Sequence, residues 1–204
     1  MTQSIELYSF SNHDRSGKVR WLAYELGLQV TENRVEPGHH VQAPYTDLNP
    51  YGTIPTVIWQ GRTMLESNAI CKTLAEQYPD SKFIVMPDED DRACFLEWTS
   101  IACESLESPL VEFFLSGVGI RPPELQALIK AGLKKKLEVT INRLPKSGFL
   151  IADRFTLADI FMSYSLRLAI NGKLIALDEV NGYLQPLMER EAAIKAGFFG
   201  SIQK

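Results

Sequence analysis

Two short stretches in the first half of the chain carry residue types that could bind a small polar ligand. Pro55 stands at the entrance of a β-branched run, and proline has no N–H and is confined in sheets to strand starts, edges and bulges. The run Thr53–Thr56 therefore leaves main-chain groups of the residue before the proline free for other partners. Glu66 and Ser67 come at the predicted start of a helix, where outward-pointing N–H groups favour an anion. A free main-chain donor and acceptor beside such a helix end would suit a small peptide that carries a carboxylate. A purely structural turn followed by a capped helix is the competing interpretation.

The elements around these stretches follow an α/β order. Apolar and β-branched runs predict strands, and periodicity of 3.6 residues predicts helices. We expect a strand at 5–8, a helix around 19–26, a strand at 28–35, a short helix opened by Pro44, strands at 56–59 and 63–65, and a helix from Ser67 to Pro79. The first two strands should pair in parallel because a helix connects them. Gln60-Gly61 predicts a tight antiparallel hairpin. This β-α-β-α-β-β-α order makes a complete small domain at residues 1–81.

The second half of the chain is predicted to be helical throughout. Pro87 and the four acids after it mark a linker at residues 82–91. We find no strand pattern from Ala93 onward, and Thr156–Asp159 matches an N-capping box. The last twenty residues have only a weak pattern. We therefore expect an all-α bundle at residues 92–204.

Composition excludes several classes of function. Hydrophobic residues make up 45% and charged residues 23% of the 204 residues, which is typical of a soluble globular protein. The net charge of −4 gives no broad basic surface for nucleic acid, and no stretch approaches the roughly 18 apolar residues of a membrane span. The three cysteines, Cys71, Cys94 and Cys103, fit no zinc or CxxC spacing, so no metal is expected. The first residues lack the features of a signal peptide, so we expect a reduced, cytoplasmic location.

Four segments of this sequence resemble one family. Asn49–Val57 is similar to N-P-x-G-x-V-P-x-L, Leu65–Ile70 to L-x-E-S-x-A-I, and Phe155–Ile160 to F-S-x-A-D-I, while Leu7–Ser9 with Lys18–Arg20 looks like a first strand and first helix. Together they span nearly the whole chain and resemble the cytosolic glutathione transferases, in particular serine- or asparagine-type bacterial members. The resemblance implies a thioredoxin-like N-terminal domain followed by an all-α helical bundle domain, with glutathione as co-substrate.

The resemblance also implies how glutathione would be held. Pro55 would be a cis-proline, and the main chain of Ile54, beside Thr53, would hydrogen-bond the cysteinyl unit. Glu66 and Ser67 would hold the γ-glutamyl end, with its carboxylate at the helix N-terminus.

The glycyl carboxylate of glutathione needs a further partner. His40 lies fifteen residues before Pro55, at a position where some relatives carry His or Gln. His39 is a close competitor and Gln42 could assist. Both histidines also fit a role as surface loop residues. An imidazole near a carboxylate can be partly charged near neutral pH.

The sequence leaves several candidates for the group that activates the thiol. A free cysteine thiol has a pKa of about 8.5, and only the thiolate is a strong nucleophile. The usual device is a hydroxyl after the first strand together with the first helix N-terminus. Matching Tyr8 and Val19 to serine-type members puts His13 at the serine position, and the alternatives are Ser11, Asn12 and Ser16. Ser11 is the nearest hydroxyl, and Ser16 fits a helix N-cap better. No cysteine occurs in this turn, which argues against reductase-like members.

Three functions follow from the resemblance. The first is a glutathione transferase that conjugates the thiolate to small, mostly apolar electrophiles in detoxification, acting as a homodimer without nucleic acid or membrane partners. The second is a glutathione-dependent isomerase or peroxidase of the same fold. The third is a non-catalytic adaptor, because fold does not imply function. Glu66 and Ser67 argue against the adaptor, which has no need of them.

Overall fold

The computed structural model describes residues 3–151 and 154–203, and the chain divides into two compact units. The first unit contains residues 1–84 and 189–200, and the second contains residues 85–188 and 201–204. The predicted division into 1–81, 82–91 and 92–204 thus differs at the C-terminus, where twelve residues belong to the first unit. The difference arises because these residues bond and pack against the helix at Ser16–Glu25.

The first unit is built on a four-stranded mixed sheet. Its strands are β1 (Ser4–Ser9), β2 (Gln29–Arg34), β3 (Thr56–Trp59) and β4 (Arg62–Leu65), in the order β2-β1-β3-β4. β1 and β2 pair in parallel, and β3 and β4 pair antiparallel, as the sequence predicts. β3 also pairs antiparallel with β1. Gln60 and Gly61 have φ of 52° and 75°, which is the double positive φ of a type I′ hairpin turn.

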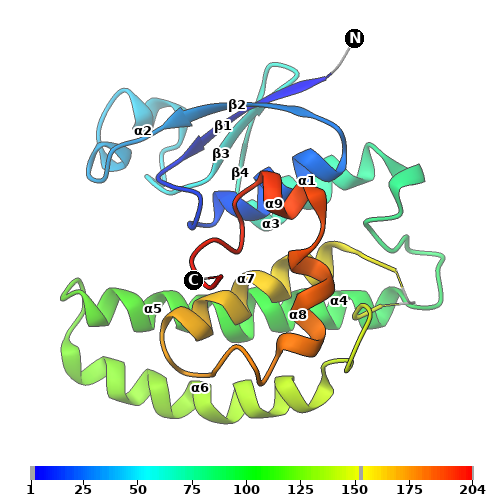
Figure 1. Cartoon of the computed structure of the whole chain (residues 1–204). Helices are drawn as coiled ribbons and strands as arrows, with labels where there is room; N and C mark the ends of the chain where they lie inside the picture. Colours follow the sequence, from blue (N-terminus) through cyan, green and yellow to red (C-terminus); the bar gives the residue numbers. More distant parts are fainter. Residues whose placement is uncertain (1–2, 152–153, 204) are drawn as a thin grey trace. The chain divides into compact units, whose positions relative to one another are not determined.

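Helices cover one face of this sheet. α1 (Ser16–Glu25), α3 (Ser67–Glu76) and α9 (Glu191–Lys195) lie on the same side, while α2 (Tyr45–Leu48) belongs to the segment between β2 and β3 (Figure 1). Two 3-10 turns complete the unit, at His39–Val41 and Pro79–Ser81. Ile5 and Leu7 of β1, Leu22 of α1 and Ile70 of α3 are all buried. The alternation of β1 therefore directs every second residue into the core beneath the helices.

α1 ends as its sequence predicts. Gly27 has a φ of 70°, its N–H donates to the carbonyl of Tyr24 at 3.1 Å, and the N–H of Leu28 donates to the carbonyl of Ala23 at 2.8 Å. This pair of bonds is a Schellman motif, which a glycine at the left-handed position permits.

The second unit is helical. It contains α4 (Arg92–Ser100), a π-helical segment (Ile101–Glu107), α5 (Ser108–Gly117), α6 (Pro123–Arg143), α7 (Leu157–Asn171) and α8 (Asn181–Met188). α7 is buried on nearly all sides. The predicted capping box is present, because Thr156 caps the helix and the side chain of Asp159 accepts from the N–H of Thr156. None of the helices in the described ranges is long and apolar enough to cross a membrane.

The π-helical segment was not predicted, and Pro109 gives a physical reason for it. Proline has no N–H, so it cannot bond the carbonyl four residues earlier, and its ring crowds that carbonyl. That carbonyl belongs to Ser105, which accepts from the Nζ of Lys136 at 3.3 Å. A second carbonyl of the segment, that of Ala102, accepts from the hydroxyl of Ser165 at 2.8 Å. Side chains from other helices therefore bond carbonyls within the widened turn.

Candidate functional site

The register of the sheet brings the predicted site residues to one edge. Tyr8 pairs with Thr56, and Thr56 pairs with Leu65. The C-terminal ends of β1 and β4 and the N-terminal end of β3 therefore meet. The turn after β1, the Ile54–Pro55 step before β3 and the start of α3 after β4 all leave the sheet from this edge.

Ile54 offers an unused main chain at this edge. The Ile54–Pro55 peptide is cis, and no hydrogen bond engages Ile54 within residues 3–151 and 154–203. The preceding carbonyl, that of Thr53, accepts from the Tyr45 hydroxyl at 2.6 Å and from the Asn49 Nδ2 at 2.8 Å. Thr53 is thus anchored internally, while the N–H and C=O of Ile54 have no hydrogen-bond partner among the described residues.

The start of α3 carries the second set of unused donors. Glu66 has φ 64° and ψ 109° with an exposed side chain, a backbone conformation that a residue other than glycine adopts only at a cost of about 1–3 kcal/mol. Ser67 begins the ten-residue helix α3 and is 5% exposed. Neither its N–H nor its hydroxyl is bonded to any other residue that the structure describes. The positive end of the α3 dipole adds to these donors.

The β1–α1 turn (residues 10–15) is organised by Asp14, which the sequence reasoning missed. Its Oδ2 accepts from the N–H groups of Phe10 at 2.9 Å and Ser11 at 2.7 Å, and its Oδ1 accepts from the N–H of Ser16 at 2.6 Å. An aspartate two residues before the start of a helix is the signal that could have identified this role, since such side chains bond nearby N–H groups.

The four candidates for thiol activation fall in different environments. Ser11 is half-buried, and its Oγ accepts from the N–H of His13 at 3.0 Å. Asn12 and His13 are exposed, and the Asn12 Oδ1 accepts from Arg34. Ser16 is fully buried, and its hydroxyl donates to the Ser11 carbonyl at 3.4 Å and accepts from Arg20 at 3.0 Å. The prediction that Ser16 caps α1 is wrong, because the N-cap is Arg15 and the Ser16 hydroxyl bonds Ser11 and Arg20 in place of helix N–H groups.

An ion pair between the buried Arg20 and the half-buried Glu32 lies next to the turn. The Arg20 Nε donates to the Glu32 Oε2 at 2.8 Å, and the Arg20 Nη2 also reaches the Ser11 carbonyl at 3.3 Å. Ser9 donates to Glu32 as well, and Arg34 lies 3.5 Å from the same carboxylate. Burial alone would raise the pKa of Glu32, but the hydrogen bonds from Arg20 and Ser9 and the charges of both arginines lower it overall. Glu32 is therefore held as a carboxylate that fixes Arg20 next to the turn.

The two histidines of the β2–α2 segment are arranged differently. His40 is half-buried, its Nδ1 accepts from the N–H of Gly38 at 3.1 Å, and its ring packs edge-on against Phe10 with centroids 4.8 Å apart. That contact places His40 beside the β1–α1 turn. His39 is exposed, and Gln42 donates to the Gly38 carbonyl at 3.2 Å.

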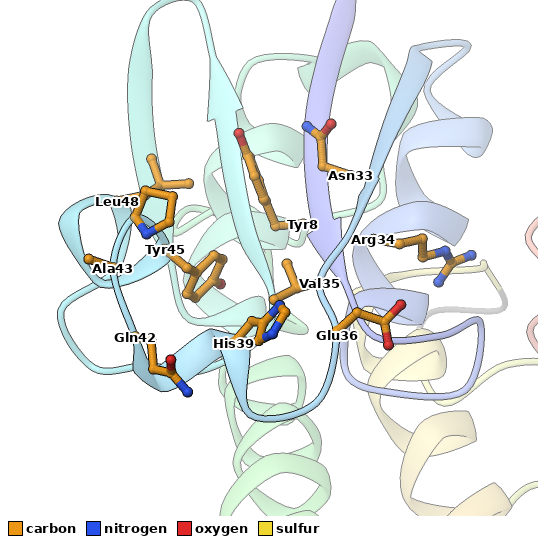
Figure 2. A pocket seen from close by; sticks show the side chains of 11 residues that line it. Tyr8, Asn33, Arg34, Val35, Glu36, His39, Gln42, Ala43, Tyr45 and Leu48 are labelled. Carbon is orange, nitrogen blue, oxygen red and sulfur yellow. The ribbon is translucent and has the colours of Figure 1, made fainter.

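A pocket of about 610 Å³ is lined by part of the same segment and by residues of the sheet. Figure 2 shows Tyr8 from β1, Val35 directly after β2, and Tyr45 and Leu48 from α2 around it. Tyr8 belongs to the set of β1 residues opposite the buried Ile5 and Leu7, so the pocket is on the sheet face away from α1 and α3. Of the residues considered for binding glutathione, His39 and Gln42 line it, whereas His40, Ile54 and Ser67 do not. The pocket is thus separate from the edge where Ile54 and Ser67 lie.

The described residues contain no set of side chains suited to bind a metal ion. No group of three or more His, Cys, Asp or Glu side chains among them is placed to hold an ion. Cys71 is buried, whereas Cys94 and Cys103 are half-buried helix residues, and none of the three forms a disulfide with another described residue. Burial, helped by the nearby acids Glu97 and Asp91, raises the pKa of Cys94, so this thiol is less reactive than a free cysteine.

Known proteins match this chain in sequence and in fold. Residues 7–82 match the family model "Glutathione S-transferase, N-terminal domain". Glutathione S-transferase GstA of Escherichia coli O157:H7 is 26% identical over 81% of this chain and 80% of its own length. Glutathione S-transferase hmp2 of Hypomyces subiculosus is 28% identical over 94% of this chain and 97% of its own.

A solved structure shares the fold of this chain. The glutathione transferase URE2P6 from Phanerochaete chrysosporium, in complex with oxidized glutathione, superposes with a TM-score of 0.82 at 23% identity, covering 95% of this chain and 94% of that one. The likeness shows that the α/β unit followed by a helical unit is the fold of that protein. Residues 7–82 are therefore a glutathione S-transferase N-terminal domain, and the chain as a whole is similar to proteins named glutathione S-transferases over most of its length.

Proposed function

We propose that this protein is a glutathione transferase, which binds glutathione at the sheet edge of the first unit and conjugates it to small, mostly apolar electrophiles. The observation that carries the proposal is the unused main chain of Ile54 beside the unused donors of Ser67. A peptide needs both a main-chain donor and a main-chain acceptor to be bound as an extended strand, and its carboxylate needs a helix N-terminus.

Each part of glutathione then has a partner of matching chemistry. The cysteinyl N–H and C=O pair with the C=O and N–H of Ile54. The γ-glutamyl carboxylate accepts from the hydroxyl and N–H of Ser67, with Glu66 facing its ammonium group. His40 is the partner for the glycyl carboxylate, because its Nδ1 is already bonded to Gly38 and its Nε2 is left to donate. Gln42 remains the assisting candidate.

Ser11 is our candidate for activating the thiol. Its Oγ accepts from the N–H of His13, which leaves its own proton to donate to the sulfur. A hydroxyl that donates to the thiolate stabilises the charged form and lowers the thiol pKa. Asn12 and His13 remain alternatives in the same turn. Ser16 is excluded as the activating residue because it is fully buried and bonded to Ser11 and Arg20.

The proposal is tested by binding and turnover in matched variants. We expect the purified protein to bind glutathione in calorimetry and to conjugate 1-chloro-2,4-dinitrobenzene. Ser67→Ala should weaken binding about tenfold or more, the value of a lost hydrogen bond to a charged group. Ser11→Ala should leave binding nearly unchanged and lower kcat by about a hundredfold, as removal of one donor to a developing charge does. Ser147→Ala, at an exposed loop serine, is the control and should change neither.

The outcomes separate the other functions. Binding without conjugation, but with turnover of a peroxide or an isomerisable substrate, would mean a glutathione-dependent peroxidase or isomerase. Neither binding nor turnover would refute the proposal and leave the adaptor. We also propose a homodimer in the cytoplasm with a role in detoxification. Light scattering tests the dimer, and a monomeric mass would contradict it.

A further inference from the structure

The last residues of the first unit are anchored on α1 by an ion pair. The Nε and Nη2 of Arg190 donate to the two carboxylate oxygens of Glu25 at 2.6 and 2.8 Å, and the Trp21 Nε1 donates to the same carboxylate at 2.8 Å. The Glu25 side chain is only 10% exposed. A bidentate, mostly buried pair of this kind fixes both position and orientation.

Aromatic packing continues the attachment toward the start of α1. The rings of Phe198 and Phe199 lie with their centroids 4.7 and 5.5 Å from that of Trp21. All three side chains are buried. The chain after α9 is thus part of the core of the first unit.

Two glycines let this chain reach the β1–α1 turn. Gly197 ends α9 with a φ of 62°, and the N–H groups of Gly197 and Phe198 bond the carbonyls of Ile194 and Ala193. A Cβ at Gly197 would lie 3.1 Å from the Asn12 Nδ2. A Cβ at Gly17 would lie 3.1 Å from the Asn12 carbonyl oxygen and 3.3 Å from the Phe198 Cδ2.

The segment after α9 also lies next to exposed residues of the β1–α1 turn. A Cβ at Gly200 would lie 3.5 Å from the His13 Cε1, at ordinary contact distance. Asn12 is therefore held on one side by Arg34, through its Oδ1, and is met on the other side by Gly197. His13, whose N–H orients the Ser11 hydroxyl, lies next to Gly200.

We propose that the C-terminal segment Gly197–Gly200 is a positioning element for thiol activation. It presses on Asn12 and His13 and so sets the direction of the Ser11 hydroxyl, without touching glutathione itself. This inference rests on the proposed function. Its physical basis is that a misplacement of about 1 Å in a reacting group, caused from a distance, can cost a hundredfold in rate.

Gly197→Ala is the test, and Gly27→Ala is a closely matched control. Both glycines close a Schellman motif with positive φ, of 62° and 70°, so alanine adds similar backbone strain at either position. A Cβ at Gly27, however, meets nothing within 4 Å. The difference between the two variants therefore isolates the push on Asn12.

The main readout is the pKa of the thiol of bound glutathione, titrated through thiolate absorbance near 240 nm. We expect Gly197→Ala to raise that pKa by about half a unit or more and to lower kcat about tenfold with little change in glutathione affinity. Gly27→Ala should lose a similar amount of thermal stability with an unchanged thiol pKa. Arg190→Gln, which loosens the anchor away from the turn, should shift the thiol pKa in the same direction by less.

A second readout does not depend on glutathione. Amide exchange at Asn12 and His13 should quicken in Gly197→Ala and not in Gly27→Ala. Equal exchange and equal thiol pKa in the two variants would overturn the inference. If the wild type binds no glutathione, the proposed function fails on its own, and the amide exchange alone decides whether the segment positions the turn.

Discussion

Asp159, at the start of α7, gives a prediction in which two physical effects oppose each other. Its carboxylate accepts from the N–H groups of Leu150 at 3.0 Å and Thr156 at 2.9 Å and from the Tyr183 hydroxyl at 3.0 Å. These bonds favour the charged form. Burial of the completely covered side chain is the larger effect and raises the pKa of Asp159 from 3.8 to about 6.

The sign of the pH dependence follows from this shift. Between pH 3.8 and about 6 the folded protein holds the Asp159 proton while the unfolded chain has lost it. The free energy of unfolding contributed by this group is therefore largest below pH 3.8 and falls as the pH rises through 6. A shift of this size corresponds to about 3 kcal/mol in total, of which about 2 kcal/mol falls between pH 4.5 and 7.5.

Asp159→Asn removes the titration while keeping the shape of the side chain. Urea unfolding of the wild type and the variant at pH 4.5 and 7.5 isolates the effect, because all other groups titrate in both. The variant should be less stable at both pH values, since its amide cannot accept all the same bonds. The stability gap should be about 2 kcal/mol larger at pH 4.5 than at pH 7.5. Asp178→Asn, at an exposed aspartate, is the control. A gap that stays constant or widens at pH 7.5 would mean that the hydrogen bonds outweigh burial, and would refute the reasoning.

Three further predictions concern stability. Glu32→Gln leaves the buried Arg20 without a counter-charge and should lower the free energy of unfolding in urea by about 3 kcal/mol at pH 7. Because the pKa of Glu32 is lowered in the folded protein, the difference between wild type and variant should shrink as the pH falls below 4.5. A difference that does not change with pH would contradict this prediction. Thr156→Ala removes the N-cap of α7 and should cost about 1 kcal/mol, whereas Thr156→Ser should restore most of it. Leu166→Ala empties a fully buried position of α7 and should lower the free energy of unfolding by about 2–5 kcal/mol, unlike Leu128→Ala at an exposed helix position.

Local patterns were enough to predict most elements of the fold. The strand at 56–59 has the predicted bounds because Pro55 and the Gln60-Gly61 turn limit it on both sides. Gly27 ends α1 and Thr156 begins α7 for equally local reasons. The parallel pairing of β1 and β2 follows from the helix between them. Each of these features depends on residues close together in the chain.

Features that depend on distant contacts were missed. The π-helical segment arises because Pro109 withholds a donor, and Lys136, twenty-seven positions further on, bonds the carbonyl affected. The place of residues 189–200 in the first unit depends on Arg190 reaching Glu25, across 165 positions. A five-residue helix such as α9 has too few turns for periodicity to reveal its buried face.

The residues of the candidate site also differ in whether local sequence was enough to predict them. Ile54, Glu66 and Ser67 could be proposed from sequence because a proline and a helix start mark their positions. The activating residue could not be chosen, because the β1–α1 turn is arranged by the Asp14 carboxylate, which bonds three N–H groups that periodicity cannot reveal.

Asp14 also limits how the turn can stabilise a thiolate. The N–H groups of Phe10, Ser11 and Ser16 donate to its carboxylate, so they are not available to donate to a sulfur anion. The carboxylate also places a negative charge near the N-terminus of α1, where it offsets part of the helix dipole. In the proposed mechanism, more of the stabilisation of the thiolate therefore falls to a side-chain donor, the Ser11 hydroxyl. The orientation of that hydroxyl, and hence the packing of residues 197–200 against Asn12 and His13, then matters more than it would if the three N–H groups were free.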